Sequence, residues 1–134
     1  MVKLDIRVIY GDTDQMGVVY YANYLRFFEA ARNEYLRAAG ARYRDVEETH
    51  GIHLPVAEAH VEYKRPARYD DLLVIEIWVS ELGRASLRFA YRVKRGDELL
   101  ATGHTVHACI DRAGKLQRLP EPLRALITPE AEPG

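Results

Sequence analysis

The feature that most constrains the fold is a change in hydrophobic periodicity within the first 39 residues. From Val2 to Tyr10 apolar residues alternate with polar ones, which predicts a strand buried on one face. From Tyr21 to Ala39 apolar residues recur every three or four positions, which predicts an amphipathic helix that ends at Gly40. The chain therefore opens with a strand followed directly by a long helix.

The rest of the chain predicts a second short helix around Tyr43 to Thr49 and then four strands. These strands run from about Leu54 to Lys64, Leu72 to Leu82, Ala85 to Lys94 and Leu99 to Ile110. Short turn segments separate them, so we expect neighbouring strands to form antiparallel hairpins in a meander. Leu119 to Ile127 closes the fold as a short strand or helix. One helix against one such sheet is an α+β arrangement.

Length and composition indicate one globular domain over residues 1–128, with a flexible tail at 129–134. The chain has 134 residues, of which 48% are hydrophobic and 29% charged. A formal net charge of −1 gives no overall attraction to nucleic acid. The single Cys109 excludes an internal disulfide, and neither a membrane-spanning run nor an apolar signal segment is found. We therefore expect a cytoplasmic protein without membrane insertion.

The loop Gly11-Asp-Thr-Asp-Gln-Met-Gly17 places two carboxylates where the strand meets the helix. The N–H groups of a helix N-terminus lack intrahelical partners and bind negative oxygens. A carboxylate beside them indicates polar chemistry at a carbonyl group. Aspartates also form turns and cap helices, and an isolated D-x-D pattern is more often structural. We expect one of the two carboxylates to build the loop.

The segment Tyr10-Gly-Asp-Thr-Asp-Gln-Met-Gly-Val-Val-Tyr-Tyr-Ala-Asn-Tyr24, with Phe27-Phe-Glu-Ala-Ala-Arg32 after it, resembles hotdog-fold acyl-CoA thioesterases of the 4-hydroxybenzoyl-CoA and Tol-Pal-associated families. The resemblance extends through Val61-Glu-Tyr-Lys-Arg-Pro-Ala-Arg-Tyr-Asp-Asp71 and Arg84-Ala-Ser86. It implies a long central helix wrapped by an antiparallel sheet of about five strands, assembled as a homodimer or homotetramer. The implied reaction is hydrolysis of an acyl-CoA to a free acid and coenzyme A, without a metal or other cofactor.

The resemblance also assigns roles within the loop. Asp14 matches the catalytic aspartate, acting as a nucleophile or as the base that activates water, and Asp12 is its loop-building partner. The backbone N–H of Tyr21 is placed against the thioester oxygen, and we assign Gly17 and Tyr24 to substrate binding. Tol-Pal-associated members carry a histidine at position 21, so an imidazole base is missing from this chain and Asp14 must act without one.

Four residues farther along the chain are candidates for contact with coenzyme A. Arg84 and Ser86 match the family's nucleotide-contacting segment, and Arg65 and Arg68 precede it in a loop. The forked donors of arginine suit phosphate groups. The structural alternative is that these are solvated charges on strands and loops.

Arg32 falls on the apolar face of the predicted helix, where an unpaired charge is costly. Glu29, one turn earlier, is the local partner. We expect a structural ion pair that braces the site, with substrate contact as the alternative.

Two histidine-containing patterns have weaker claims to chemistry. The first pattern comprises Glu58, His60 and Glu62, which alternate along one face of a predicted strand. It fits an exposed or intersubunit face better than a site for acid–base or metal chemistry. The second pattern comprises His104, His107 and Cys109, a set of residue types that suggests a zinc site. Strand alternation places His104 on the opposite face from His107 and Cys109, so the three cannot converge on one ion.

Two rival functions are a hotdog dehydratase or hydratase acting on acyl thioesters, and a non-catalytic acyl-CoA-binding or scaffold protein. Dehydratases of this fold need a histidine paired with an acid, and no histidine lies between Tyr10 and Tyr24. Release of free thiol from acyl-CoA distinguishes the three.

Overall fold

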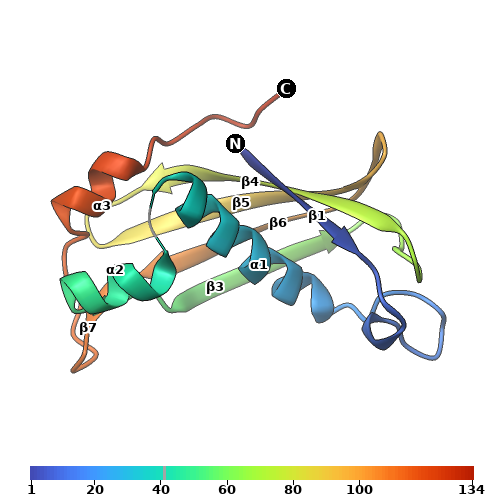
Figure 1. Ribbon diagram of the computed structural model, residues 1–134, viewed down its shortest axis with the longest axis horizontal. Coiled ribbons are helices and arrows are strands. Elements are labelled where there is room, and N and C mark those ends of the chain that lie inside the picture. Colours follow the sequence, from blue (N-terminus) through green and yellow to red (C-terminus); the bar gives the residue numbers. More distant parts are fainter. Residues whose placement is uncertain (41) are drawn as a thin grey trace.

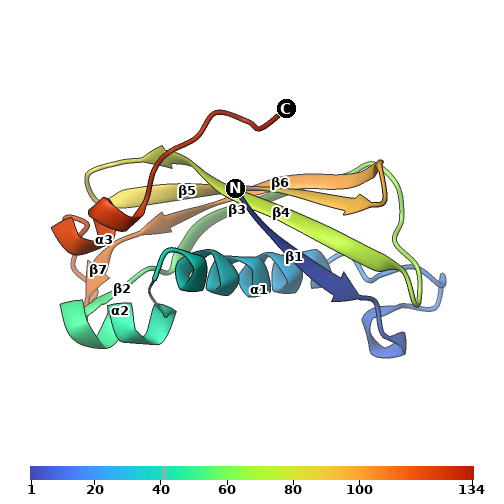
Figure 2. The ribbon, with the colours of Figure 1, turned by 45° about the horizontal axis from the view of Figure 1, so that its top comes forward.

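One long helix lies along one face of a five-stranded antiparallel sheet (Figure 1, Figure 2). The computed structural model describes residues 1–40 and 42–134. The helix, α1, spans Asn23–Ala38, and the strand order is β1-β4-β5-β6-β3. The predicted α+β class, with about five strands around a central helix, is confirmed.

The remaining elements largely follow the predicted runs, and Leu119 to Ile127 contains a helix. In chain order they are β1 (Val2–Arg7), the 3-10 turn η1 (Tyr10–Asp12), α2 (Tyr43–His50), β2 (Ile52–His53), β3 (Val56–Tyr63), β4 (Leu72–Leu82), β5 (Ser86–Arg95), β6 (Glu98–Ala108), β7 (Ile110–Asp111) and α3 (Glu121–Leu126). β2 and β7 form a separate two-stranded ladder that the sequence did not predict. Among the described residues, no helix combines the length and apolar character needed to cross a membrane.

The boundaries of α1 follow from local hydrogen bonding. The helix begins at Asn23, two residues later than predicted, because the N–H groups of Asn23 and Tyr24 donate to the carbonyls of Tyr20 and Tyr21 in a preceding turn. The predicted stop at Gly40 is confirmed. Its φ of 94° lies in the left-handed region, which glycine adopts without strain.

α1 packs closely on β6 at Gly103. Its buried face consists of Tyr24, Phe27, Phe28, Ala31, Tyr35 and Leu36. A Cβ atom at position 103 would lie 2.7 Å from the ring of Phe28 and 2.6 Å from the carbonyl oxygen of His60. The same phenyl ring stacks on Tyr91 with centroids 4.0 Å apart. The absence of a side chain at Gly103 therefore allows the helix to approach the sheet.

The predicted order of neighbouring strands is wrong at β3. β4, β5 and β6 form a meander, but β3 pairs with β6 rather than with β4. The connection from β3 to β4 crosses the end of the β5–β6 hairpin, where the N–H groups of Lys64 and Arg65 donate to Leu100 O at 2.8 and 3.0 Å. Arg95 fixes the crossing by donating to Pro66 O at 3.2 Å. A connection of this length carries no local sign that it crosses a neighbouring hairpin.

β3 is the least covered strand. All of its residues except Val61 are exposed, and within the described chain its outer edge pairs with no strand. An open edge of this length is suited to pairing with another chain.

The C-terminal residues 129–134 lie over the face of the sheet opposite α1 (Figure 2). The N–H of Glu130 donates to β4 at 2.8 Å, and its carboxylate binds the N-terminal ammonium of Met1 at 2.6 Å. Arg92 donates to Pro133 O at 2.6 Å and pairs with buried Glu76 at 2.7 Å. The predicted mobility of this tail stays a prediction, but its contacts are specific.

Candidate active site

The loop before α1 folds back on itself and holds Asp14 near its tip. The N–H of Asp14 donates to Val18 O at 2.9 Å, and the N–H of Gly17 donates to Asp14 O at 3.0 Å. Gly17 has a φ of 77°, so glycine suits the turn. One carboxylate oxygen of Asp14 accepts the N–H of Met16 at 2.9 Å. Within the described part of the chain, the other carboxylate oxygen has no hydrogen-bond partner.

Asp12 ties this loop to the helix. Asp12 is 4% exposed. One carboxylate oxygen accepts the N–H of Ile9 at 3.0 Å, and the other accepts a hydrogen bond from the guanidinium of Arg26. Its carbonyl accepts the N–H of Tyr20 and the side-chain amide of Asn23, both at 2.9 Å. These are the contacts of a loop-building residue. Sequence reasoning missed Arg26, which falls on the polar face of the helical pattern and gives no signal of its own.

The start of α1 presents open backbone donors. The cap residue Ala22 supplies no side-chain hydrogen bond, and in the described part of the chain the N–H of Tyr21 has no acceptor. Tyr63 of β3 donates to Tyr21 O at 2.8 Å, which fixes the orientation of this segment. Tyr63 was not predicted, because its role depends on β3 lying beside α1.

Asp14 lies near the same aromatic segment. The pKa of Tyr20 is raised, first by its hydrogen bond and charge interaction with Tyr21, then by desolvation, and last by the negative charge of Asp14. Tyr20 and Tyr21 have ring centroids 4.8 Å apart. Backbone hydrogen bonds from Asp14 N–H to Val18 O and from Tyr20 N–H to Asp12 O hold the Asp14 loop against the segment that leads into α1.

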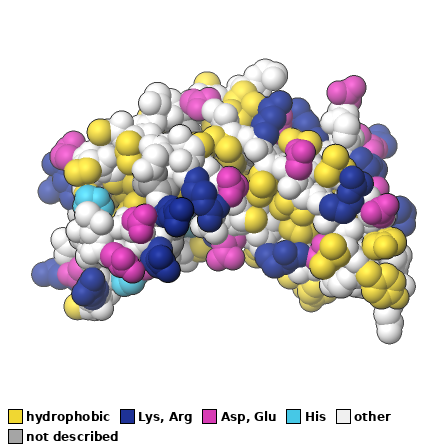
Figure 3. Space-filling view, in the orientation of Figure 1, with side chains coloured by type: hydrophobic (Ala, Val, Ile, Leu, Met, Phe, Trp, Pro, Cys, Tyr) yellow, Lys and Arg dark blue, Asp and Glu magenta, His cyan; other side chains and the backbone are white. Residues whose placement is uncertain are grey.

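A hollow of about 270 Å³ adjoins the start of α1. Its lining comprises Val18, Val19, Tyr21, Tyr24, Tyr63, Lys64, Arg65 and Pro66. This lining includes Tyr24 and Arg65, which were assigned to substrate binding. Arg68, also assigned to substrate binding, forms an isolated antiparallel β-bridge with Val18 of the lining. The hydroxyl of Tyr24 accepts the N–H of Ala67 at 3.4 Å, and burial raises its pKa. Figure 3 shows Lys and Arg side chains beside hydrophobic ones at this end of the molecule.

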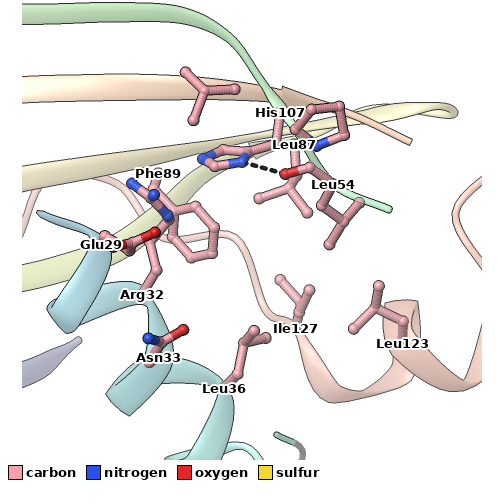
Figure 4. A pocket seen from close by; sticks show the side chains of 12 residues that line it. Glu29, Arg32, Asn33, Leu36, Leu54, Leu87, Phe89, His107, Leu123 and Ile127 are labelled. Atoms are coloured by element: carbon pink, nitrogen blue, oxygen red, sulfur yellow. Dashed lines mark hydrogen bonds between the residues drawn. The ribbon is translucent and has the colours of Figure 1, made fainter. Parts of the chain in front are cut away.

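A second cavity, of about 260 Å³, lies between the later turns of α1 and the sheet (Figure 4). Its apolar wall is formed by Leu36, Leu54, Pro55, Val56, Leu87, Phe89, Leu123 and Ile127. Its polar wall is formed by Glu29, Arg32, Asn33 and His107. Both hollows lie along the side of α1 that faces β3.

The expected ion pair between Arg32 and Glu29 is not formed. No carboxylate of the described residues lies within 4 Å of the Arg32 guanidinium, which instead donates to the Tyr91 hydroxyl at 3.2 Å. Glu29 is exposed at the mouth of the cavity that it lines. The sheet, rather than the preceding helical turn, therefore provides the partner of Arg32.

The sequence matches the profile of the thioesterase-like superfamily over residues 8–127. The chain belongs to the thioesterase-like superfamily. Acyl-CoA thioesterase YbgC of Haemophilus influenzae is 39% identical over 112 residues, covering 84% of this chain and 82% of that protein. The 1,4-dihydroxy-2-naphthoyl-CoA hydrolase of Synechococcus elongatus is 37% identical over 120 residues, covering 88% of both proteins.

Solved structures agree with this assignment. The crystal structure of a hypothetical protein from Aquifex aeolicus has a TM-score of 0.90 and 31% identity, covering 96% of this chain and 100% of that one. The hotdog fold and the resemblance to thioesterases are thereby confirmed. The thioesterase and thioester hydrolase names of these relatives support a hydrolase.

In this thioesterase-superfamily chain, Arg84 and Ser86 lie far from Asp14. They sit where β4 passes into β5, whereas the Asp14 loop is near the start of β4, as the contact between Val8 and Asp71 shows (Figure 1). β4 has 11 residues, so roughly 35 Å separates the two ends at 3.3 Å per residue. One chain therefore does not bring the predicted acid and the predicted nucleotide contacts together.

The histidines are engaged in packing and hydrogen bonds. His107 is buried and uses both ring nitrogens, facing Leu54 O at 2.9 Å and Thr105 Oγ1 at 2.8 Å. His104 lies on the other face of the strand and stacks on His60 with centroids 5.2 Å apart. Burial, followed by the Arg88 charge, lowers the pKa of His104. Among the described residues, no three potential ligands are grouped to hold a metal ion.

Proposed function

We propose that this chain hydrolyses an acyl-CoA thioester to a free acid and coenzyme A, with Asp14 and the N–H of Tyr21 acting at the carbonyl. The observation that carries the proposal is the start of α1. There, the N–H of Tyr21 has no acceptor in the described chain, and backbone hydrogen bonds from Asp14 to Val18 and from Tyr20 to Asp12 hold the preceding loop, whose Asp14 keeps one carboxylate oxygen free, against the segment that leads to it. The thioester oxygen becomes negative during attack, and a helix N-terminus carries roughly half a positive charge. One such donor contributes roughly 3 kcal/mol to transition-state stabilisation.

Asp14 can act by either of two routes. As a nucleophile, its free oxygen bonds to the thioester carbon, the C–S bond breaks, coenzyme A leaves as a thiolate, and water then cleaves the mixed anhydride. As a base, it takes a proton from water, whose oxygen attacks the same carbon and expels the thiolate. Both routes use only water and the chain's own groups, so the proposal includes no metal or separate cofactor.

We further propose that the active form is at least a homodimer, joined through β3. The strand has an exposed edge that no strand of the described chain covers. Antiparallel pairing of two β3 edges across a two-fold axis reverses the partner sheet. The partner's Arg84 and Ser86 then come to the end that carries Asp14. Stacking of two dimers would give a tetramer. We expect the reaction to take place in the cytoplasm.

The decisive experiment measures free thiol released from a panel of acyl-CoAs. We expect Asp14→Asn to fold normally and to lose roughly 10²-fold or more in turnover, as for loss of a positioned base or nucleophile. Asp97→Asn is the matched control, because Asp97 is exposed in the turn between β5 and β6.

A folded protein that releases no thiol from any acyl-CoA contradicts the proposed activity. If that protein instead hydrates or dehydrates acyl-CoAs, the dehydratase alternative is correct. Binding without any turnover points to a non-catalytic acyl-CoA-binding protein.

A further inference from the structure

A chain of hydrogen bonds anchors Arg32 at the polar wall of the second cavity. Arg32 donates to the Tyr91 hydroxyl at 3.2 Å, which lies 2.6 Å from Thr105 Oγ1. Thr105 Oγ1 is 2.8 Å from His107 Nε2, and His107 Nδ1 is 2.9 Å from Leu54 O. The network thus connects α1 to β5, to β6 and to the segment before β3.

The direction of every hydrogen bond in this chain is determined. Burial, with a smaller contribution from the Arg32 charge, lowers the pKa of His107 to about 4, so its ring is neutral at pH 7. A carbonyl can only accept, so Nδ1 carries the proton and donates to Leu54, and Nε2 accepts from Thr105. Thr105 then accepts from Tyr91, whose oxygen accepts from Arg32. A guanidinium, which can only donate, fits the start of this order.

The anchored guanidinium has donors left over. Arginine carries five N–H groups, and one of them is used by Tyr91. No carboxylate of the described residues lies within 4 Å of Arg32, although the group lines the cavity (Figure 4). An oxygen-bearing ligand is the natural partner for a fixed cation that faces the apolar wall of the cavity.

We infer that this cavity receives the far end of the acyl group, and that Arg32 selects acyl groups with a terminal oxygen, a carboxylate above all. The inference rests on the proposed function, because it takes the thioester carbonyl to be at Tyr21. Tyr21 and Arg32 are 11 residues apart, which is roughly 16 Å along a helix at 1.5 Å per residue. A long acyl group is needed to reach from one to the other.

Glu29 provides a second, opposite test of the inference. Its carboxylate lines the same cavity without pairing with Arg32. It therefore repels an acyl carboxylate that Arg32 attracts. Removing the two charges one at a time should shift selectivity in opposite directions.

The experiment compares thiol release from sebacoyl-CoA and decanoyl-CoA, which have equal chain length but differ in the terminal carboxylate. We expect Arg32→Met to lower the sebacoyl-to-decanoyl ratio of kcat/KM by roughly tenfold to a hundredfold, as for one hydrogen bond to a charged group. Glu29→Gln should raise that ratio. Arg37→Met, on the same helix but outside this cavity, should leave it unchanged.

A shorter pair, adipoyl-CoA and hexanoyl-CoA, should show no dependence on Arg32, because these acyl groups do not reach it. Equal dependence in both pairs overturns the inference. The inference is also overturned if both Arg32→Met and Glu29→Gln release thiol and neither substitution changes the sebacoyl-to-decanoyl ratio of kcat/KM. The ratio cancels a general loss of folded enzyme, and Glu29→Gln provides the test if Arg32→Met does not fold.

Calorimetric binding of free sebacate and decanoate separates this inference from the proposed function. Preferential, Arg32-dependent binding of sebacate, without thiol release from any acyl-CoA, supports the cavity assignment while refuting the hydrolase. Thiol release without any preference that depends on Arg32 refutes the cavity assignment and leaves the proposed function intact.

Discussion

Replacing Asp12 and Asp14 one at a time should separate loop building from chemistry. In Asp12, one carboxylate oxygen accepts the N–H of Ile9 and the other accepts Arg26. Asparagine keeps the shape but has a single acceptor, so in Asp12→Asn one of these donors must face an amide N–H₂. Leaving a buried donor without its partner costs about 1–3 kcal/mol. We take about 2 kcal/mol, because Arg26 is 56% exposed and can turn to water.

Asp14→Asn has no such cost. The oxygen that accepts the N–H of Met16 is kept by an asparagine amide, and Asp14 is only half-buried. We expect a change in the free energy of unfolding within about 0.5 kcal/mol. Asp12→Asn should lower the melting temperature by roughly 8 °C, taking about 4 °C per kcal/mol for a domain of this size.

The assay combines thermal unfolding with thiol release at a temperature where all variants are folded. Asp12→Asn should be unstable but active, and Asp14→Asn should be stable but inactive. The reasoning is refuted if Asp14→Asn is the less stable variant, or if Asp12→Asn loses activity as completely as Asp14→Asn while fully folded.

Three further results follow from the structure. Gly103→Ala should destabilise the protein by about 1–3 kcal/mol in chemical unfolding, since its Cβ would lie 2.7 Å from the ring of Phe28; unchanged stability would show that the helix shifts freely. Because the pKa of His107 is lowered from 6.5 to about 4, the unfolded state binds the proton more strongly between these pH values, and the free energy of unfolding decreases as the pH is lowered from 6.5 to 4. At pH 5 the free energy of unfolding should be about 2 kcal/mol lower than at pH 7 for this reason. Unfolding curves of His107→Gln should lack this pH-dependent loss. Mixing inactive Asp14→Asn subunits with Arg84→Ala subunits should restore thiol release if sites are shared between chains, and an active monomer in sedimentation would contradict sharing.

Local patterns in the sequence determined most of the elements of this fold. The predicted run from Leu72 to Leu82 has the bounds of β4, and alternation identified β1, although the strand ends at Arg7 rather than at Tyr10. Gly40 marked the end of α1, because periodicity and backbone freedom act over a few residues. The Gly11–Gly17 loop identified the candidate site for the same reason. Its carboxylates and the helix start are adjacent in the chain.

Only the tertiary structure decided which segments lie side by side. The crossing of β3 to the far edge of the sheet, which brings Tyr63 to Tyr21, depends on contacts between residues distant in sequence. The partner of Arg32 was misassigned to Glu29 for this reason, because helical spacing shows neighbours on one helix but not the hydroxyl that a strand 59 residues away presents to it. Local physics fixes what each segment becomes, whereas the pairing of segments depends on packing across the whole core.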